Sequence, residues 1–271
     1  GRSLSPAANH TNAIRGVSSR YVTLLQDDDI WEPTFLERTT SFLESHEDCG
    51  LAFVRLIEID AQGSEIGRAR DRVPPGTYGA REIVPLLLSR NVIGAPGAVL
   101  VRRVALEAAG PYYDERFPGA FDLELWMRLV LEAPVGAIDE SLLRERAHHG
   151  RYSVAVEWGA ELLRLQTHFV ELAARRRPEI AIEEATWRHA RSGALLSRSL
   201  DELIGGEPGR SLSLARDAFR LDHRRAVDRR MLGIAAGLLL GPLGPHAVLS
   251  GRRHYRTSYS GDPAYRRKRR P

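Results

Sequence analysis

Hydrophobic and polar positions alternate in two different ways along this chain. Up to about residue 153, short apolar runs such as residues 21–25, 51–54 and 97–101 end abruptly in polar clusters, which is typical of buried strands. Stretches with apolar residues at helical spacing, such as residues 33–45, lie between these runs. Beyond residue 153 only helical spacing remains. The pattern predicts an α/β domain over residues 1–153 and an α-helical region over residues 154–271.

The boundaries of the predicted elements follow from the same pattern and from proline and glycine positions. Residues 68–79 are charged and rich in proline and glycine, so they predict an exposed loop. The predicted strands cover residues 21–25, 51–60, 97–101 and 135–138. The predicted helices cover residues 9–20, 33–45, 81–90 and 103–109, a helix capped by Asp122, and residues 157–176, 180–196, 200–204, 211–221 and a last helix from Ala226.

The first apolar run ends in a cluster of carboxylates, within the sequence YVTLLQDDDIWEP. Asp27, Asp28 and Asp29 therefore lie in a loop that follows a buried strand, where open α/β sheets bind their ligands. Three adjacent carboxylates repel one another unless a cation or full solvation compensates them. Mg²⁺ or Mn²⁺ suits an oxygen-ligand site of this kind. A solvated acidic turn is the alternative interpretation of the cluster.

Composition limits the remaining choices. The 271 residues have 43% hydrophobic content, enough for a real core. The one cysteine, Cys49, excludes an internal disulfide and fits a reducing compartment. The net charge of +4 is concentrated in basic runs towards the C-terminus, which attract phosphate groups such as those of anionic lipid. We interpret the last of these runs, within residues 262–271, as a solubilising tail.

Residues 231–249 form an apolar stretch whose one ionisable side chain is His246. Arginines flank it on both sides, and Pro242 and Pro245 interrupt it. The stretch is short for a membrane span, and the prolines would break a spanning helix. We expect an interfacial or buried hairpin that docks on an anionic membrane surface.

Four motifs, taken in order, resemble the family-2 glycosyltransferases of the GT-A fold. They are LLQDDDIWEP, GAVLVRRVALEAAG, FDLELWMRL and RERAHHGRYS. The resemblance covers roughly residues 9–153. It implies a partial Rossmann-type sheet with flanking helices, followed here by the helical C-terminal region. Relatives begin with a nucleotide-binding strand and loop that do not precede Gly1, so we expect the chain to start inside the fold.

The resemblance assigns the acidic cluster to metal binding through a nucleotide diphosphate. The usual pattern is Asp-x-Asp-Asp, and here Gln26 stands at its first position. The metal pair is therefore either Asp27 with Asp29 or Asp28 with Asp29. We expect Asp28 and Asp29 to be the chief ligands of Mg²⁺ or Mn²⁺, with Asp27 on the nucleotide.

The later motifs supply the other candidate site residues. A Glu-Asp pair in the family provides the catalytic base, and here Phe121 replaces the Glu while Asp122 matches the Asp. A plain helix N-cap is the alternative role of Asp122. Arg128 and His148 match the family's Arg and His, and the resemblance places them near the nucleotide. We interpret Trp126 as a core residue.

The resemblance implies an inverting glycosyltransferase that moves a sugar from a nucleotide-diphosphate donor to a polysaccharide or lipid-linked acceptor. Cell-envelope glycan synthesis, at the cytoplasmic face of the membrane, is the expected setting, without nucleic acid as a partner. A catalytically inactive remnant that binds a membrane surface or a partner is the alternative. An Asp-based phosphohydrolase is disfavoured, because no D-x-D-x-T/V motif follows the strand.

Overall fold

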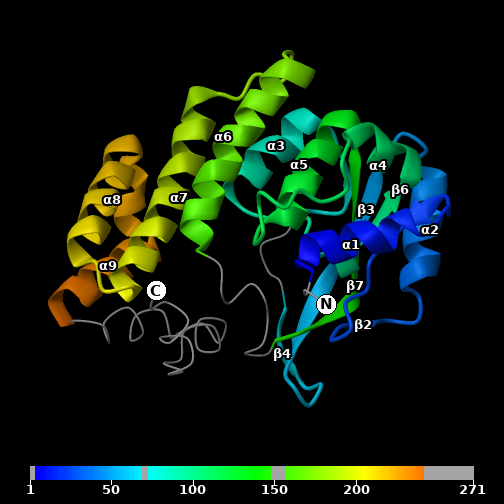
Figure 1. The fold of residues 1–271 in the computed structure, drawn as a ribbon, viewed down its shortest axis with the longest axis horizontal. Helices are drawn as coiled ribbons and strands as arrows, with labels where there is room; N and C mark the ends of the chain where they lie inside the picture. Colours follow the sequence, from blue (N-terminus) through cyan, green and yellow to red (C-terminus); the bar gives the residue numbers. More distant parts are fainter. Residues whose placement is uncertain (1–3, 69–72, 148–156, 241–271) are drawn as a thin grey trace. The chain divides into compact units, whose positions relative to one another are not determined.

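The computed structural model describes residues 4–68, 73–147 and 157–240 (Figure 1). The chain divides into two compact units. Unit 1 comprises residues 1–146 and 165–183, and unit 2 comprises residues 147–164 and 184–271. Helix α6, Trp158–Arg176, begins in unit 2 and ends in unit 1. The predicted domain boundary after residue 153 falls outside the described residues and stays a prediction.

Unit 1 is built on a seven-stranded mixed sheet with the strand order β1-β6-β3-β7-β2. The central pair, β3 and β7, is parallel, while β6 and β1 continue the sheet in antiparallel pairing. Strand β3 has the sequence LAFVRLIEI and is buried along almost its whole length, as a central strand must be. The strands are β1 Tyr21–Val22, β2 Ile30–Trp31, β3 Leu51–Ile59, β4 Glu65–Arg68, which pairs with β3, β5 Gly76–Tyr78, which pairs with β7, β6 Val99–Arg102 and β7 Val135–Arg146.

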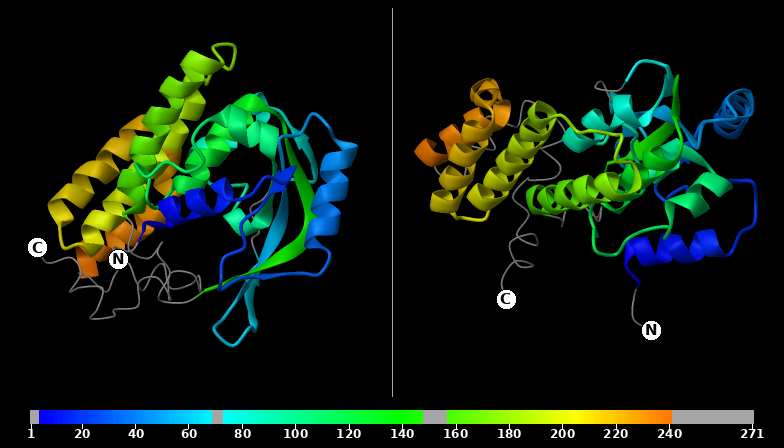
Figure 2. Two further views of the ribbon diagram at one scale, coloured as in Figure 1. Left: turned by 45° about the vertical axis from the view of Figure 1, so that its right-hand side comes forward. Right: turned by 90° about the horizontal axis from the view of Figure 1, so that it is seen from above.

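Helices cover both faces of this sheet, with α2 on one side and α3 and α5 on the other (Figure 2). Helix α2 approaches the sheet closely at Gly136, where an added Cβ atom would lie 2.0 Å from the Phe42 ring. Helix α4 ends at Gly110, whose φ of 101° is accessible to glycine. The helices of unit 1 are α1 Pro6–Arg15, α2 Phe35–Ser45, α3 Ala80–Ser89, α4 Arg103–Ala109 and α5 Phe121–Glu132, with a 3₁₀ turn η1 at Pro96–Ala98.

Two strands differ in length from the prediction. The first predicted strand, residues 21–25, forms ladder hydrogen bonds only at Tyr21 and Val22, at the edge of the sheet. The last one continues to Arg146 instead of ending near residue 138. The polar residues along β7 do not have the pattern of a strand, so the prediction ended too early. They belong to the strand because β7 pairs with β3, β2 and β5.

Unit 2 is helical in its described residues. Helix α7 runs unbroken from Glu184 to Ile204, so the two helices predicted at 180–196 and 200–204 are one. A hydrophobic core of unit 2 consists of Leu196, Leu200 and Leu203 of α7, packed against Ala215 and Ala218 of α8 and Ile234 of α9. The other elements are α8 Pro208–Leu221, the 3₁₀ turn η3 His223–Val227 and α9 Arg229–Leu240.

Helix α9 holds the first part of the predicted apolar hairpin, while residues 241–249 lie outside the described residues. Within the described ranges, no helix combines the length and the apolar character that crossing a membrane requires.

Candidate active site

The acidic residues lie in the loop that joins β1 to β2, the first and last strands in the order of the sheet. The loop is fixed at its far end by Trp31, which pairs with Leu143 in β7 and stacks on Phe35 with ring centroids 4.5 Å apart. The Trp31 indole Nε1 donates a hydrogen bond of 2.8 Å to the Gly97 carbonyl. The tryptophan after the acidic cluster therefore ties the loop to the segment that precedes β6.

The three carboxylates of the loop have different environments. Asp27 is exposed, Asp28 is half-buried, and Asp29 is only 8% exposed. The Asp29 carboxylate oxygen Oδ1 accepts a hydrogen bond of 2.9 Å from the backbone N–H of Arg146. Asp29 thus packs against the end of β7, while Asp27 faces solvent.

The donors that this loop offers to a metal are oxygens. Besides the carboxylates, the Gln26 side-chain oxygen Oε1 is buried without a hydrogen-bond partner among the described residues. Buried polar atoms in folded proteins rarely lack partners, so such an atom marks a place where a ligand or water belongs. Carboxylate and amide oxygens are the ligands that Mg²⁺ and Mn²⁺ prefer. The residues present therefore fit the predicted metal ion.

Asp122 lies in the first turn of α5, but it is not the N-cap. The helix begins at Phe121, Ala120 is the N-cap residue, and Asp122 is the second residue inside the helix. The prediction of an Asp122 cap was wrong because an Asp before an apolar run resembles a cap signal. A carboxylate in the first helical turn is still stabilised by the helix dipole.

The neighbours of Asp122 hold its carboxylate at the surface of an otherwise buried helix. Its Oδ1 accepts from the Leu123 backbone N–H at 2.7 Å, and its Oδ2 accepts from the Asn91 side-chain amide at 3.3 Å. Burial first, and then the nearby Asp122 charge, raises the pKa of Tyr113. Residues 121–131 are buried except for Asp122, which is half-buried.

One segment, residues 91–97, connects the acidic loop with the start of α5. Trp31 bonds to its end at Gly97, and Asn91 at its beginning bonds to Asp122. In the middle, the Gly94 carbonyl accepts a 2.8 Å hydrogen bond from the indole of Trp126. Trp126 is buried, so its prediction as a core residue is confirmed. The acidic loop and Asp122 therefore border opposite ends of the same short segment.

Arg128 occupies a different environment from the one the resemblance implied. Its guanidinium has five N–H donors, and five hydrogen bonds are present. Two go to the carboxylate of Glu124, at 2.8 Å each, and three go to the carbonyls of Ala109, Pro111 and Tyr112. These bonds leave no guanidinium donor for a diphosphate, so Arg128 has a structural role here. His148 lies outside the described residues.

Sequence reasoning missed a second group that could bind a metal. Candidate ligand atoms of Asp114, Glu124 and His168 all lie within 4.8 Å of one another in unit 1. Arg116 and Arg128 already pair with the two carboxylates, and their positive charges disfavour a cation at this place. The i,i+4 spacing of Glu124 and Arg128 was visible in the sequence, but the approach of His168 from α6 was not.

Comparisons with known proteins agree with the predicted fold. No protein-family model matches the chain. An uncharacterized glycosyltransferase of Methanocaldococcus jannaschii, MJ1057, is 24% identical over 146 residues, which are 54% of this chain and 48% of that protein. The chain thus spans about half the length of this curated relative.

Solved structures of Staphylococcus aureus TarS, residues 1–349, are similar to this chain. The TM-score is 0.52 at 16% identity, covering 98% of this chain and 72% of TarS. A complex of the same TarS fragment with UDP gives the same TM-score at 17% identity. This likeness confirms the predicted fold, a GT-A-like α/β domain followed by a helical region.

Proposed function

We propose that this chain is a glycosyltransferase that moves a sugar from a nucleotide-diphosphate donor to an acceptor hydroxyl. The observation that carries the proposal is the arrangement around the 91–97 segment. A loop of three carboxylates lies at one end of the segment and Asp122 lies at the other. The sequence similarity to a glycosyltransferase and the fold shared with TarS, which has been solved with UDP, support this reading. A uridine diphosphate sugar is the donor to test first.

Asp28 and Asp29 are the proposed chief ligands of Mg²⁺ or Mn²⁺, with Asp27 as the alternative partner of Asp29. The buried Asp29 is held in place by the Arg146 backbone, and Asp28 is its half-buried neighbour. When bound, such an ion neutralises the charge that develops on the leaving diphosphate. Asp27, which is exposed, is free to orient the nucleotide.

Asp122 is the proposed general base of an inverting transfer. The acceptor hydroxyl must attack the anomeric carbon from the side opposite the diphosphate, so its base cannot be one of the metal ligands. In support of this role, Asp122 bonds to the 91–97 segment at Asn91, whereas Trp31, which follows the acidic loop, bonds to it at Gly97. The Asn91 amide orients its carboxylate, and the N-terminal end of α5 favours a negative charge there.

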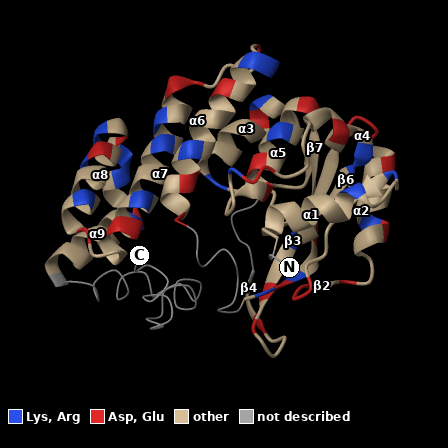
Figure 3. Ribbon diagram, viewed as in Figure 1, with Lys and Arg blue, Asp and Glu red and all other residues tan. Residues whose placement is uncertain are grey.

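The acceptor is proposed to be a polysaccharide or a lipid-linked glycan of the cell envelope, met at the inner face of the membrane. The outer face of α9 supports a membrane contact. Leu232 is 56% exposed and Leu239 is 83% exposed, and Figure 3 shows α9 largely free of charged residues. Two exposed arginines, Arg224 and Arg229, precede Leu232 in the sequence, and their positive charges would attract anionic lipid.

The decisive experiment measures nucleotide binding and sugar transfer by the purified chain. We expect UDP to bind in the presence of Mn²⁺, and UDP-sugars to be turned over. Asp28→Asn and Asp29→Asn should each abolish metal-dependent turnover. Asp122→Asn keeps the shape but loses the proton acceptor, so turnover should fall by about 10² with UDP binding unchanged. The matched control is Glu47→Gln, an exposed carboxylate of the same unit.

Two outcomes would contradict the proposal. If the wild-type chain binds no nucleoside diphosphate with Mn²⁺ or Mg²⁺, the alternative hypothesis is favoured, in which the chain is a catalytically inactive remnant that binds a membrane surface or a partner. If both Asn variants of the acidic loop keep normal turnover with the metal chelated, the metal assignment is wrong.

A further inference from the structure

Arg146, the last residue of β7, makes more contacts with the acidic loop than its place in a strand requires. Its backbone N–H donates to the Asp29 carboxylate at 2.9 Å. Its guanidinium Nε donates to the backbone carbonyl of Asp28 at 3.0 Å. One residue thus holds both the side chain of Asp29 and the peptide bond between Asp28 and Asp29.

The other end of the same guanidinium is bound to the turn between β3 and β4. Its Nη1 donates to the carbonyls of Asp60 at 2.8 Å and Ala61 at 3.1 Å. The Asp60 carboxylate closes this turn by accepting from the backbone N–H groups of Gln62 and Ser64, each at 2.9 Å. Arg146 therefore ties the acidic loop to a turn that has its own hydrogen bonds.

Bonds from a charged guanidinium to carbonyl oxygens are stronger than neutral ones, and its planar fork fixes several acceptors in one geometry. The three carboxylates of the loop repel one another, so the loop tends to open unless its backbone is held. The arginine side chain holds that backbone through the Asp28 carbonyl, and the Arg146 backbone N–H holds the Asp29 carboxylate.

We propose that Arg146 is a positioning residue: it fixes the Asp28–Asp29 backbone so that the two carboxylates are preorganised for a divalent cation with nucleoside diphosphate. The proposal rests on the proposed function of the loop.

The sign of the expected effect separates positioning from simple electrostatics. If Arg146 acted only through its charge, its removal would strengthen Mn²⁺ binding, because a positive charge near the carboxylates would be lost. If it positions the carboxylates, its removal weakens Mn²⁺ binding in spite of the lost repulsion. Residues that orient metal ligands typically change metal affinity by about 10–100-fold when replaced.

The test compares two variants. Arg146→Met loses both the positive charge and the guanidinium donors, whereas Arg146→Lys keeps the positive charge but loses the planar guanidinium. Mn²⁺ binding with UDP present is measured by calorimetry on the full chain. We expect both variants to bind Mn²⁺ at least about tenfold more weakly than wild type. The control is Arg55→Met, which removes an arginine of β3 that pairs with Asp139. Unchanged or stronger Mn²⁺ binding in Arg146→Met overturns the proposal.

Hydrogen exchange supplies a readout that does not depend on the proposed function. Arg146→Met should raise amide exchange in the acidic loop and in the β3–β4 turn, and Arg55→Met should not. If exchange there stays at the wild-type level, Arg146 does not position the loop, whatever the metal data show. If wild type binds no Mn²⁺ with UDP while exchange rises as expected, the proposed function fails and the positioning of the backbone stands.

Discussion

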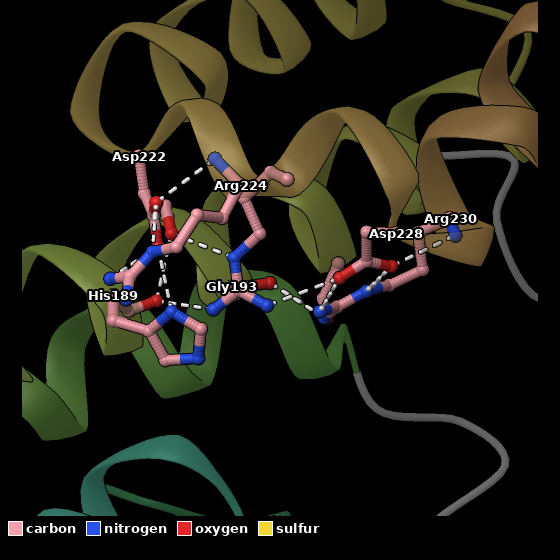
Figure 4. A network of polar contacts seen from close by, with 9 residues as sticks. His189, Gly193, Asp222, Arg224, Asp228 and Arg230 are labelled. Atoms are coloured by element: carbon pink, nitrogen blue, oxygen red, sulfur yellow. Dashed lines mark hydrogen bonds and ion pairs between the residues drawn. The ribbon is translucent and has the colours of Figure 1, made fainter.

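The two units use arginine and carboxylate side chains in opposite ways. In unit 1 the Glu124–Arg128 pair is almost completely buried, with side-chain exposures of 2% and 6%. In unit 2 a chain of polar contacts runs along the start of η3 and α9, through His189, Asp222, Arg224, Asp228 and Arg230 (Figure 4). The buried pair joins α5 to residues 109–112, because Arg128 also donates to carbonyls there. The unit 2 network instead connects several helices near the surface.

This difference in burial predicts in which unit the removal of a charged side chain destabilises the fold more. A buried charge that loses its partner keeps its full desolvation penalty, so breaking such a pair is strongly destabilising. In the unit 2 network the carboxylates of Asp222 and Asp228 each have two side-chain partners. Arg225 donates to Ser192, Asp228 and the His189 carbonyl. Loss of one group there leaves the others partly satisfied and within reach of water.

The largest effect is expected from Arg128→Met in unit 1. This change leaves the Glu124 carboxylate buried without its arginine and removes hydrogen bonds to the Pro111 and Tyr112 carbonyls, so the free energy of unfolding should fall by about 3–5 kcal/mol. Urea unfolding followed by circular dichroism measures it. The control Arg116→Met breaks the partly exposed pair with Asp114 and should cost about 1 kcal/mol or less.

The double variant Glu124→Leu with Arg128→Met sharpens this test. It removes both charges, so it should be less destabilised than Arg128→Met alone. If Arg128→Met is no worse than Arg116→Met, burial does not set the two networks apart and the comparison fails.

A second contrast concerns apolar surface. The sheet of unit 1 has helices on both faces, but the outer face of α9 in unit 2 carries Leu232 and Leu239 in the open. We expect the double variant Leu232→Ser with Leu239→Ser to lower binding to anionic phospholipid vesicles by about tenfold or more, since each buried leucine is worth about 1.5–3 kcal/mol. Vesicle flotation at low and high salt measures the change.

Val104→Ser is the matched control, because Val104 is also an exposed apolar residue but lies on α4 of unit 1. It should leave vesicle binding unchanged. Equal flotation of wild type and the α9 variant, with anionic and with neutral vesicles alike, would refute a membrane contact through this face.

The sequence was informative where local pattern decides the structure. The apolar run of β3 and the glycine that ends α4 predicted their elements, because burial and positive φ are local requirements. The length of β7 was missed because its polar residues are held in the sheet by partner strands far away in sequence. The sequence showed the carboxylates of the candidate site, but it did not show that Arg146 holds their loop. The contacts of Arg146 with Asp60 and Ala61 join residues about 85 positions apart, and no spacing rule reveals them.

The smallest effect is expected from the unit 2 network, and it depends on pH. Burial alone would raise the pKa of Asp228, whose side chain is 16% exposed, but hydrogen bonds and charge from Arg230 and Arg225 outweigh burial and lower this pKa to about 2. The usual value is 3.8.

Because the folded pKa lies below the usual value, ionised Asp228 stabilises the protein above about pH 4, and this contribution is lost as the pH falls towards 2. The free energy of unfolding of Asp228→Asn should therefore be lower than that of wild type by about 1 kcal/mol near pH 7. The difference should begin to shrink below about pH 5, where the unfolded carboxyl starts to take up its proton, and should be lost as the pH falls towards 2. Asp217→Asn, which breaks an exposed pair with Arg220 in the same unit, should show a small difference that varies little with pH. A difference for Asp228→Asn that stays constant down to pH 3 would mean that the network does not hold this carboxylate ionised, and that its arginines serve packing alone.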